Sequence, residues 1–85
     1  MPEISRFLGI VIRMFYDDHP PPHFRAEYGN YKAQLDLKKL ELIEGELPPR
    51  IRAVVIRWAT EHRTELLDNW ERREERKPLA KIEPI

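Results

Sequence analysis

Polar and apolar residues alternate along the first half of the chain, a pattern that predicts β-strands. Residues 9–16 carry β-branched and aromatic side chains at both sets of alternate positions, so we expect a strand that is central or covered on both faces. Residues 23–28 and 31–37 predict a second and a third strand. The glycine–asparagine pair at 29–30 predicts a tight hairpin between them, in which the glycine takes a positive φ. A short fourth strand is expected at residues 40–43.

The second half of the chain has the period of an amphipathic helix. Pro48 and Pro49 mark its start, because proline is tolerated in the first helical turn. An apolar stripe then recurs at steps of three and four residues, formed by Ile51, Val54, Val55, Trp58, His62, Leu66 and Trp70. An unbroken helix as far as residue 76 would span roughly 40 Å at 1.5 Å per residue. That length exceeds the width of such a small domain, so we expect the helix either to bend near Thr64 or to project beyond the sheet.

These elements predict one α+β domain over residues 1–76, an antiparallel β-meander of three to four strands packed by one long C-terminal helix. The 85 residues suffice for one domain and not for two. Residues 77–85 are expected to form an extended tail, because Pro78 stops a helix. Three apolar residues of this tail recur at a step of three and fit a segment laid in a groove: Leu79, Ile82 and Ile85.

The composition excludes several classes of protein and site. Lys and Arg number 15, as do Asp and Glu, so no overall charge attracts the chain to nucleic acid or to an acidic membrane. The absence of cysteine excludes disulfides, thiolate nucleophiles and cysteine-based zinc sites. No stretch approaches the roughly 18 apolar residues of a membrane helix. The uncharged run at residues 7–12 is too short for a signal peptide. We therefore expect a cytoplasmic protein with no membrane association, no cofactor and a shallow site.

The residue types that carry chemistry gather at residues 17–25, around three consecutive prolines that stiffen the loop. They are Asp17, Asp18, His19, His23 and Arg25. His19, His23 and an aspartate are ligand types for a divalent cation such as zinc. The extended prolines separate the two histidine backbones by roughly 12 Å, so no metal is assigned. The plainest interpretation is that the aspartates form a turn and that the other side chains are solvated.

Acid–base chemistry on a phosphodiester is a further interpretation of this loop. His23 and Arg25 are two residues apart on an expected strand, so they share a face. A histidine moves a proton near neutral pH and an arginine holds a phosphate oxygen, which suits a metal-independent ribonuclease. His62 is a candidate second imidazole if that face of the strand meets the helix. Otherwise it is a half-buried histidine on the apolar stripe.

Trp70, near the end of the helix, has two interpretations that the sequence does not separate. It is either the last core residue or an exposed anchor for a partner protein. Trp58, one stripe position before His62, is expected in the core. The basic residues Arg72 and Arg73 that follow Trp70 are interpreted as a solvated helix end.

Three segments carry a resemblance to a known family: residues 4–13 (ISRFLGIVIR), 18–26 (DHPPPHFRA) and 58–70 (WATEHRTELLDNW). They resemble the small bacterial proteins of domain-of-unknown-function family 4160, over nearly the whole chain. The resemblance implies no established activity. It implies a small partner protein encoded by a neighbouring gene, in pairs that look like toxin–antitoxin modules. Where the family typically reads His-Phe-His-Ala, this chain has Arg25, so a two-histidine strand site is missing one imidazole.

We therefore expect a protein-interaction component of a bacterial two-gene, toxin–antitoxin-like module. Its partner surface is expected at a sheet edge, at Trp70 and at the apolar tail residues. The alternative is a metal-independent ribonuclease that uses His23 and Arg25. A nucleic-acid-binding regulator is a second alternative, disfavoured by the zero net charge and by the missing helix-turn-helix pattern. A homodimer and RNA stay open as partners.

Overall fold

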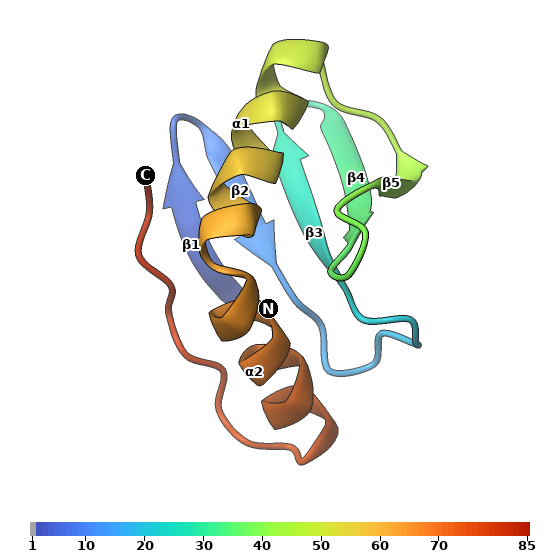
Figure 1. The fold of residues 1–85 in the computed structure, drawn as a ribbon, viewed down its shortest axis with the longest axis vertical. Coiled ribbons are helices and arrows are strands. Elements are labelled where there is room, and N and C mark those ends of the chain that lie inside the picture. Colours follow the sequence, from blue (N-terminus) through green and yellow to red (C-terminus); the bar gives the residue numbers. More distant parts are fainter. Residues whose placement is uncertain (1) are drawn as a thin grey trace.

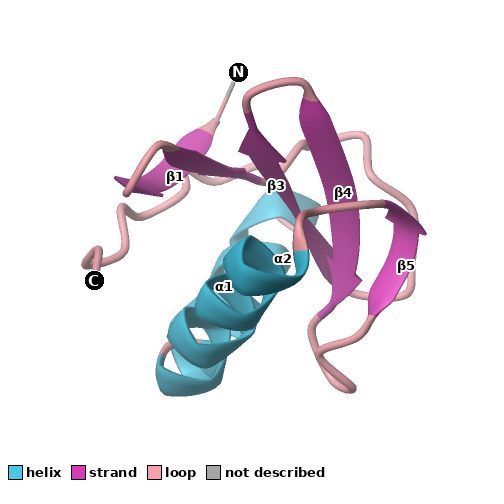
Figure 2. Ribbon diagram, turned by 90° about the horizontal axis from the view of Figure 1, so that it is seen from above, coloured by secondary structure: helices cyan, strands magenta, loops and turns pink. Residues whose placement is uncertain are grey.

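The computed structural model describes residues 2–85 and shows an antiparallel sheet with two helices on one of its faces (Figures 1 and 2). Five strands follow one another across the sheet in chain order: β1 (Glu3–Phe7), β2 (Ile10–Arg13), β3 (His23–Tyr28), β4 (Tyr31–Asp36) and β5 (Leu42–Gly45). Helices α1 (Pro49–Glu61) and α2 (Arg63–Glu74) come after the sheet. The predicted α+β class with an antiparallel meander is confirmed. The predicted strand number and the single long helix are wrong.

The strand missing from the prediction is β1, which pairs with β2 through a tight hairpin. Leu8 and Gly9 between the two strands have φ values of 51° and 78°, and positive φ at both central residues matches the twist of paired strands. The predicted strand over residues 9–16 is therefore shorter and ends at Arg13. Beyond it, the N–H of Met14 donates to the carbonyl oxygen of Pro2.

The hairpin between β3 and β4 is confirmed. Tyr28 pairs with Tyr31, and Gly29 has a φ of 57°. The next connection, from β4 to β5, is organised by Asp36, whose Oδ1 accepts the N–H groups of Lys38 and Lys39 at 2.7 and 2.8 Å. This side chain occupies backbone donors that would otherwise be unpaired in the turn.

The helical segment breaks at His62, between α1 and α2. His62 has φ −119° and ψ 23°, although its N–H still donates to the carbonyl oxygen of Trp58 at 3.1 Å. The longest dimension of the molecule is 34 Å, which is shorter than the roughly 40 Å of an unbroken helix. The break lies two residues before Thr64, where a bend was one of the two expected outcomes.

The core fills the space between the helices and one face of the sheet. Trp58 is fully buried on α1, and its ring lies 5.2 Å from that of Phe7 on β1 and 6.2 Å from that of Phe24 on β3. On the strands, buried residues alternate with half-buried ones, as in the pattern of β2. The half-buried set faces away from the helices, and no helix among residues 2–85 covers that open face (Figure 2). No described helix is long and apolar enough to cross a membrane.

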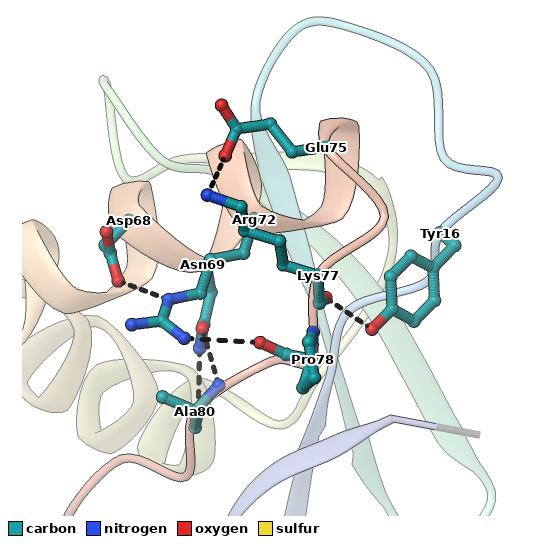
Figure 3. Close-up of polar contacts among 8 residues, drawn as sticks. All are labelled: Tyr16, Asp68, Asn69, Arg72, Glu75, Lys77, Pro78 and Ala80. Atoms are coloured by element: carbon teal, nitrogen blue, oxygen red, sulfur yellow. Dashed lines mark hydrogen bonds and ion pairs between the residues drawn. The ribbon is translucent and has the colours of Figure 1, made fainter.

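Residues 77–85 run back along α2 and β1 without helix or strand (Figures 1 and 3). The fully buried amide of Asn69 binds both backbone groups of one tail residue, since its Nδ2 donates to Ala80 O and its Oδ1 accepts from Ala80 N. Further on, the N–H of Ile82 donates to the carbonyl oxygen of Ile4 at 2.8 Å. The tail is therefore fixed to the domain by specific polar contacts.

Candidate functional site

An aspartate, an arginine and a histidine converge where the proline-rich loop enters β3. The guanidinium NH2 of Arg25 donates to Asp18 Oδ1 at 2.6 Å, and His23 Nε2 lies 3.5 Å from Asp18 Oδ2. Asp18 is 8% exposed and His23 is 5% exposed. Both groups therefore lie largely out of water, while the Arg25 side chain reaches the surface.

Local chain geometry explains the convergence. Residues two apart on a strand share a side, which brings His23 and Arg25 together. Asp18 is turned toward them by a short loop in which its N–H donates to Phe15 O and its Oδ2 accepts the Phe15 N–H, both at 3.3 Å. The guanidinium carbon of Arg25 lies 4.5 Å from the centre of the Phe15 ring. Arg25 is thus held by a carboxylate and by an aromatic face.

The hydrogen bonds define which nitrogen of His23 carries a proton. Nδ1 lies 2.9 Å from the carbonyl oxygen of Pro21, and a carbonyl oxygen only accepts, so Nδ1 is the donor. Nε2 has neither a hydrogen-bond partner nor solvent contact. Nε2 is therefore closed to a substrate in this arrangement.

The end of α2 closes the site from the helix side. Trp70 is 4% exposed and its ring lies 5.3 Å from that of His23. The guanidinium of Arg73 lies 3.7 Å over the Trp70 ring and donates to the carbonyl oxygen of Tyr16 at 2.8 Å. The indole therefore occupies a core position within this chain. Arg73 is buried, contrary to its interpretation as part of a solvated helix end. The sequence did contain one indication of this contact, because residues three apart on a helix, such as Trp70 and Arg73, are neighbours on its surface.

The other predicted site residues lie apart from this cluster. Asp17 and His19 are exposed. His62 packs on Trp58 with ring centres 5.4 Å apart, and its Nδ1 lies 2.6 Å from Glu65 Oε1. Within residues 2–85 no hydrogen bond or ion pair joins His62 to His23. Of the three tail residues, Leu79 is half-buried, Ile82 is buried and Ile85 is 60% exposed.

Two shallow hollows flank Arg25 on the open face of the sheet, and both are also lined by Gln34. One, of about 280 Å³, is walled by the proline-rich loop and by Ile43 of β5. The other, of about 380 Å³, is lined by side chains of both signs, among them Glu27, Lys32 and Glu44. No three His, Asp or Glu side chains among residues 2–85 are grouped so that they could hold a metal ion.

No curated protein and no solved structure matches the chain. A family model described as a domain of unknown function, DUF4160, matches residues 9–71. The matched region runs from the β1–β2 hairpin to the residue after Trp70, and so includes the proline-rich loop and the Asp18–His23–Arg25 cluster. The chain therefore belongs to the DUF4160 family.

Proposed function

We propose that this chain is the protein-binding component of a two-gene, toxin–antitoxin-like module and that it binds its partner along the outer edge of β5. The observation that carries the proposal is the exposure of that edge. β5 is the last strand of the sheet (Figure 2). Three of its four residues are exposed, and Ile43 is 48% exposed. An uncovered strand edge presents unpaired backbone groups that can bind an added strand.

The opposite edge of the sheet differs, which makes the exposure of β5 informative. There the tail lies beside β1, where Ile82 donates its N–H to Ile4 O and the Lys81 ammonium donates to Glu3 O at 2.7 Å. Proteins commonly cover one edge in this way to prevent unwanted pairing. Because the β1 edge is covered and the β5 edge is not, the contrast supports a binding role for β5.

The proposal moves the partner surface away from most of the residues that the sequence suggested for it. Trp70 and Ile82 are packed inside this chain, and Ile85 is the one predicted anchor that is well exposed. Ile43 gives the β5 edge an apolar residue in place of these. The two-gene part of the proposal rests on the resemblance alone, which implies a small protein encoded by a neighbouring gene.

Co-expression with the small protein encoded by the adjacent gene tests this function. We expect a stoichiometric complex by size exclusion and light scattering. Ile43→Lys should abolish the complex, because a charge on an edge strand opposes strand addition. Ile85→Lys places the same charge on the exposed tail end and should leave the complex intact. If the chain elutes alone beside its neighbour's product, the proposal is wrong.

Acid–base cleavage of RNA is the second candidate, and the observation that favours it is the convergence of Asp18, His23 and Arg25 beside a hollow. It ranks second because Arg25 already binds Asp18 and because His23 Nε2 has no solvent contact. RNA cleavage by the purified chain should disappear in His23→Ala and persist in His62→Ala. Cleavage that survives His23→Ala would eliminate this candidate.

A further inference from the structure

The open face of the sheet carries two rows of side chains that end at β5. The pairing of the strands defines the first row as Arg13, Arg25, Gln34 and Glu44. The second row contains Val11, Glu27 and Lys32. Glu46, the residue after β5, continues this second row, because its N–H donates to the carbonyl oxygen of Lys32 at 3.1 Å.

Charges of opposite sign follow one another in the second row, whereas the first row begins with two arginines as neighbours, Arg13 and Arg25. Glu27, Lys32 and Glu46 alternate across the second row, and Arg13 forms an ion pair with Glu27 at 3.3 Å. Both rows end in an exposed glutamate, and within residues 2–85 neither Glu44 nor Glu46 takes part in an ion pair. Directly opposed charges stabilise neighbouring strands when their signs differ. A basic side chain is therefore the matching group at the next position of each row.

The backbone of β5 offers hydrogen bonds at the same place. The Glu46 N–H points toward β4, and backbone groups of successive residues point to opposite sides of an antiparallel strand. The N–H and C=O of Gly45 therefore point away from β4, toward the open edge. Gly45 lies between the two glutamates, so an added strand would bond at Gly45 and face a carboxylate on either side.

We infer that β5 accepts a sixth strand from the partner, an extended basic segment with Lys or Arg at two alternate positions. These two residues pair with Glu44 and Glu46, and an apolar residue of the segment packs beside Ile43. The inference rests on the proposed function and specifies the chemistry of the partner. A second copy of this chain fits poorly, because pairing two β5 edges gathers the glutamates of both copies, and like charges on neighbouring strands are destabilising.

A synthetic peptide tests the edge without knowledge of the natural partner. The probe is a nine-residue peptide of alternating Lys and Val with blocked termini, added to the ¹⁵N-labelled full chain. We expect amide shifts confined to residues 42–46 and hydrogen exchange at the Gly45 amide slowed at least tenfold. A peptide of alternating Glu and Val should bind at least tenfold more weakly. Shifts centred on the helices or on the proline-rich loop would overturn the inference.

Charge reversal then tests the rows. Glu44→Lys with Glu46→Lys should invert the preference between the two peptides, while Glu61→Lys with Glu71→Lys, on exposed helical positions, should leave it unchanged. If the reversed chain does not fold, Glu44→Gln with Glu46→Gln should remove the preference. An unchanged preference in the folded edge variants contradicts the assignment.

The two proposals fail in different ways. A complex with the neighbouring gene's product that survives reversal of Glu44 and Glu46 overturns the basic-strand inference and leaves the proposed function standing. Binding of the Lys peptide at Gly45 without any complex with that product supports the inference about the edge and contradicts the proposed function.

Discussion

At the scale of single residues, Asp18 is the group on which the candidate site depends. Its carboxylate is mostly buried and receives the Arg25 guanidinium and the Phe15 N–H. Removing a partner from a buried charge costs more than the bond contributed, because the charge is left without compensation. Arg25 is therefore first a structural partner of the loop, and any role in binding comes in addition to that.

Asp36 gives a prediction of how the stability of the fold depends on pH. The N–H groups of Lys39 and Lys38 donate to its carboxylate and hold its pKa below the ordinary value of 3.8. A folded-state pKa below the unfolded one means that the stabilisation is present above pH 3.8 and is lost as the pH falls through the folded value.

We expect Asp36→Ala to lower the free energy of unfolding at pH 7 by about 1 kcal/mol, as for other lost side-chain caps. The measurement is urea unfolding at pH 7 and near pH 3. Asp36→Asn keeps an acceptor but does not titrate, so the stability difference between wild type and Asp36→Asn should shrink at the lower pH. A difference that grows on acidification would contradict this account.

Sequence alone predicted some contacts of the candidate site and missed others. The spacing of His23 and Arg25 on one strand predicted that they share a side, and the structure brings Asp18 to both. Arg73 was missed because the Tyr16 carbonyl oxygen to which it donates lies 57 residues away in the sequence. Trp70 could not be assigned for the same reason, since what covers it comes from the other end of the chain.

At the scale of elements, local patterns predicted the strands that alternate clearly and missed those that depend on pairing. The hairpin at Gly29 follows from its turn residues. Two of the five residues of β1, Ser5 and Arg6, are polar and weaken its strand pattern. The segment is a strand because β2 pairs with it. A bend in the helix was one of two outcomes expected from its length, and length does not specify the residue at which the break occurs, His62.

The pairing of β5 with β4 supplies an element-scale prediction at Gly45. This residue has a φ of 79°, and a Cβ there would meet the carbonyl oxygen of Lys32. Gly45→Ala should therefore lower the free energy of unfolding by on the order of 2 kcal/mol or more, because it strains the backbone and displaces the strand. Gly29→Ala is the matched control, because its φ is also positive but nothing lies within 4 Å. Gly29→Ala should lower the free energy of unfolding by only about 1 kcal/mol. Equal losses in thermal or urea unfolding would exclude a close contact at Gly45.

At the scale of the whole molecule, the two ends of the chain stabilise each other. The tail reaches β1 through the Ile82–Ile4 hydrogen bond, and Glu83 O accepts the indole N–H of Trp58 at 2.9 Å. A domain of this size has little free energy to spare. The tail therefore belongs to the folding unit and also covers one edge of the sheet, so that the exposed edge is the one formed by β5.

This division of the two edges can be tested at the end of the chain. Ile82→Ala removes a buried side chain and should lower the free energy of unfolding by about 2–4 kcal/mol. Ile85→Ala, three residues on and 60% exposed, should change it by less than about 0.5 kcal/mol. Deleting residues 79–85 should uncover β1 and produce self-association that rises with concentration in light scattering. If the two alanine variants are equally stable and the shortened chain stays monomeric, the tail does not protect the β1 edge. The contrast between a covered β1 edge and an open β5 edge then no longer supports a binding role for β5.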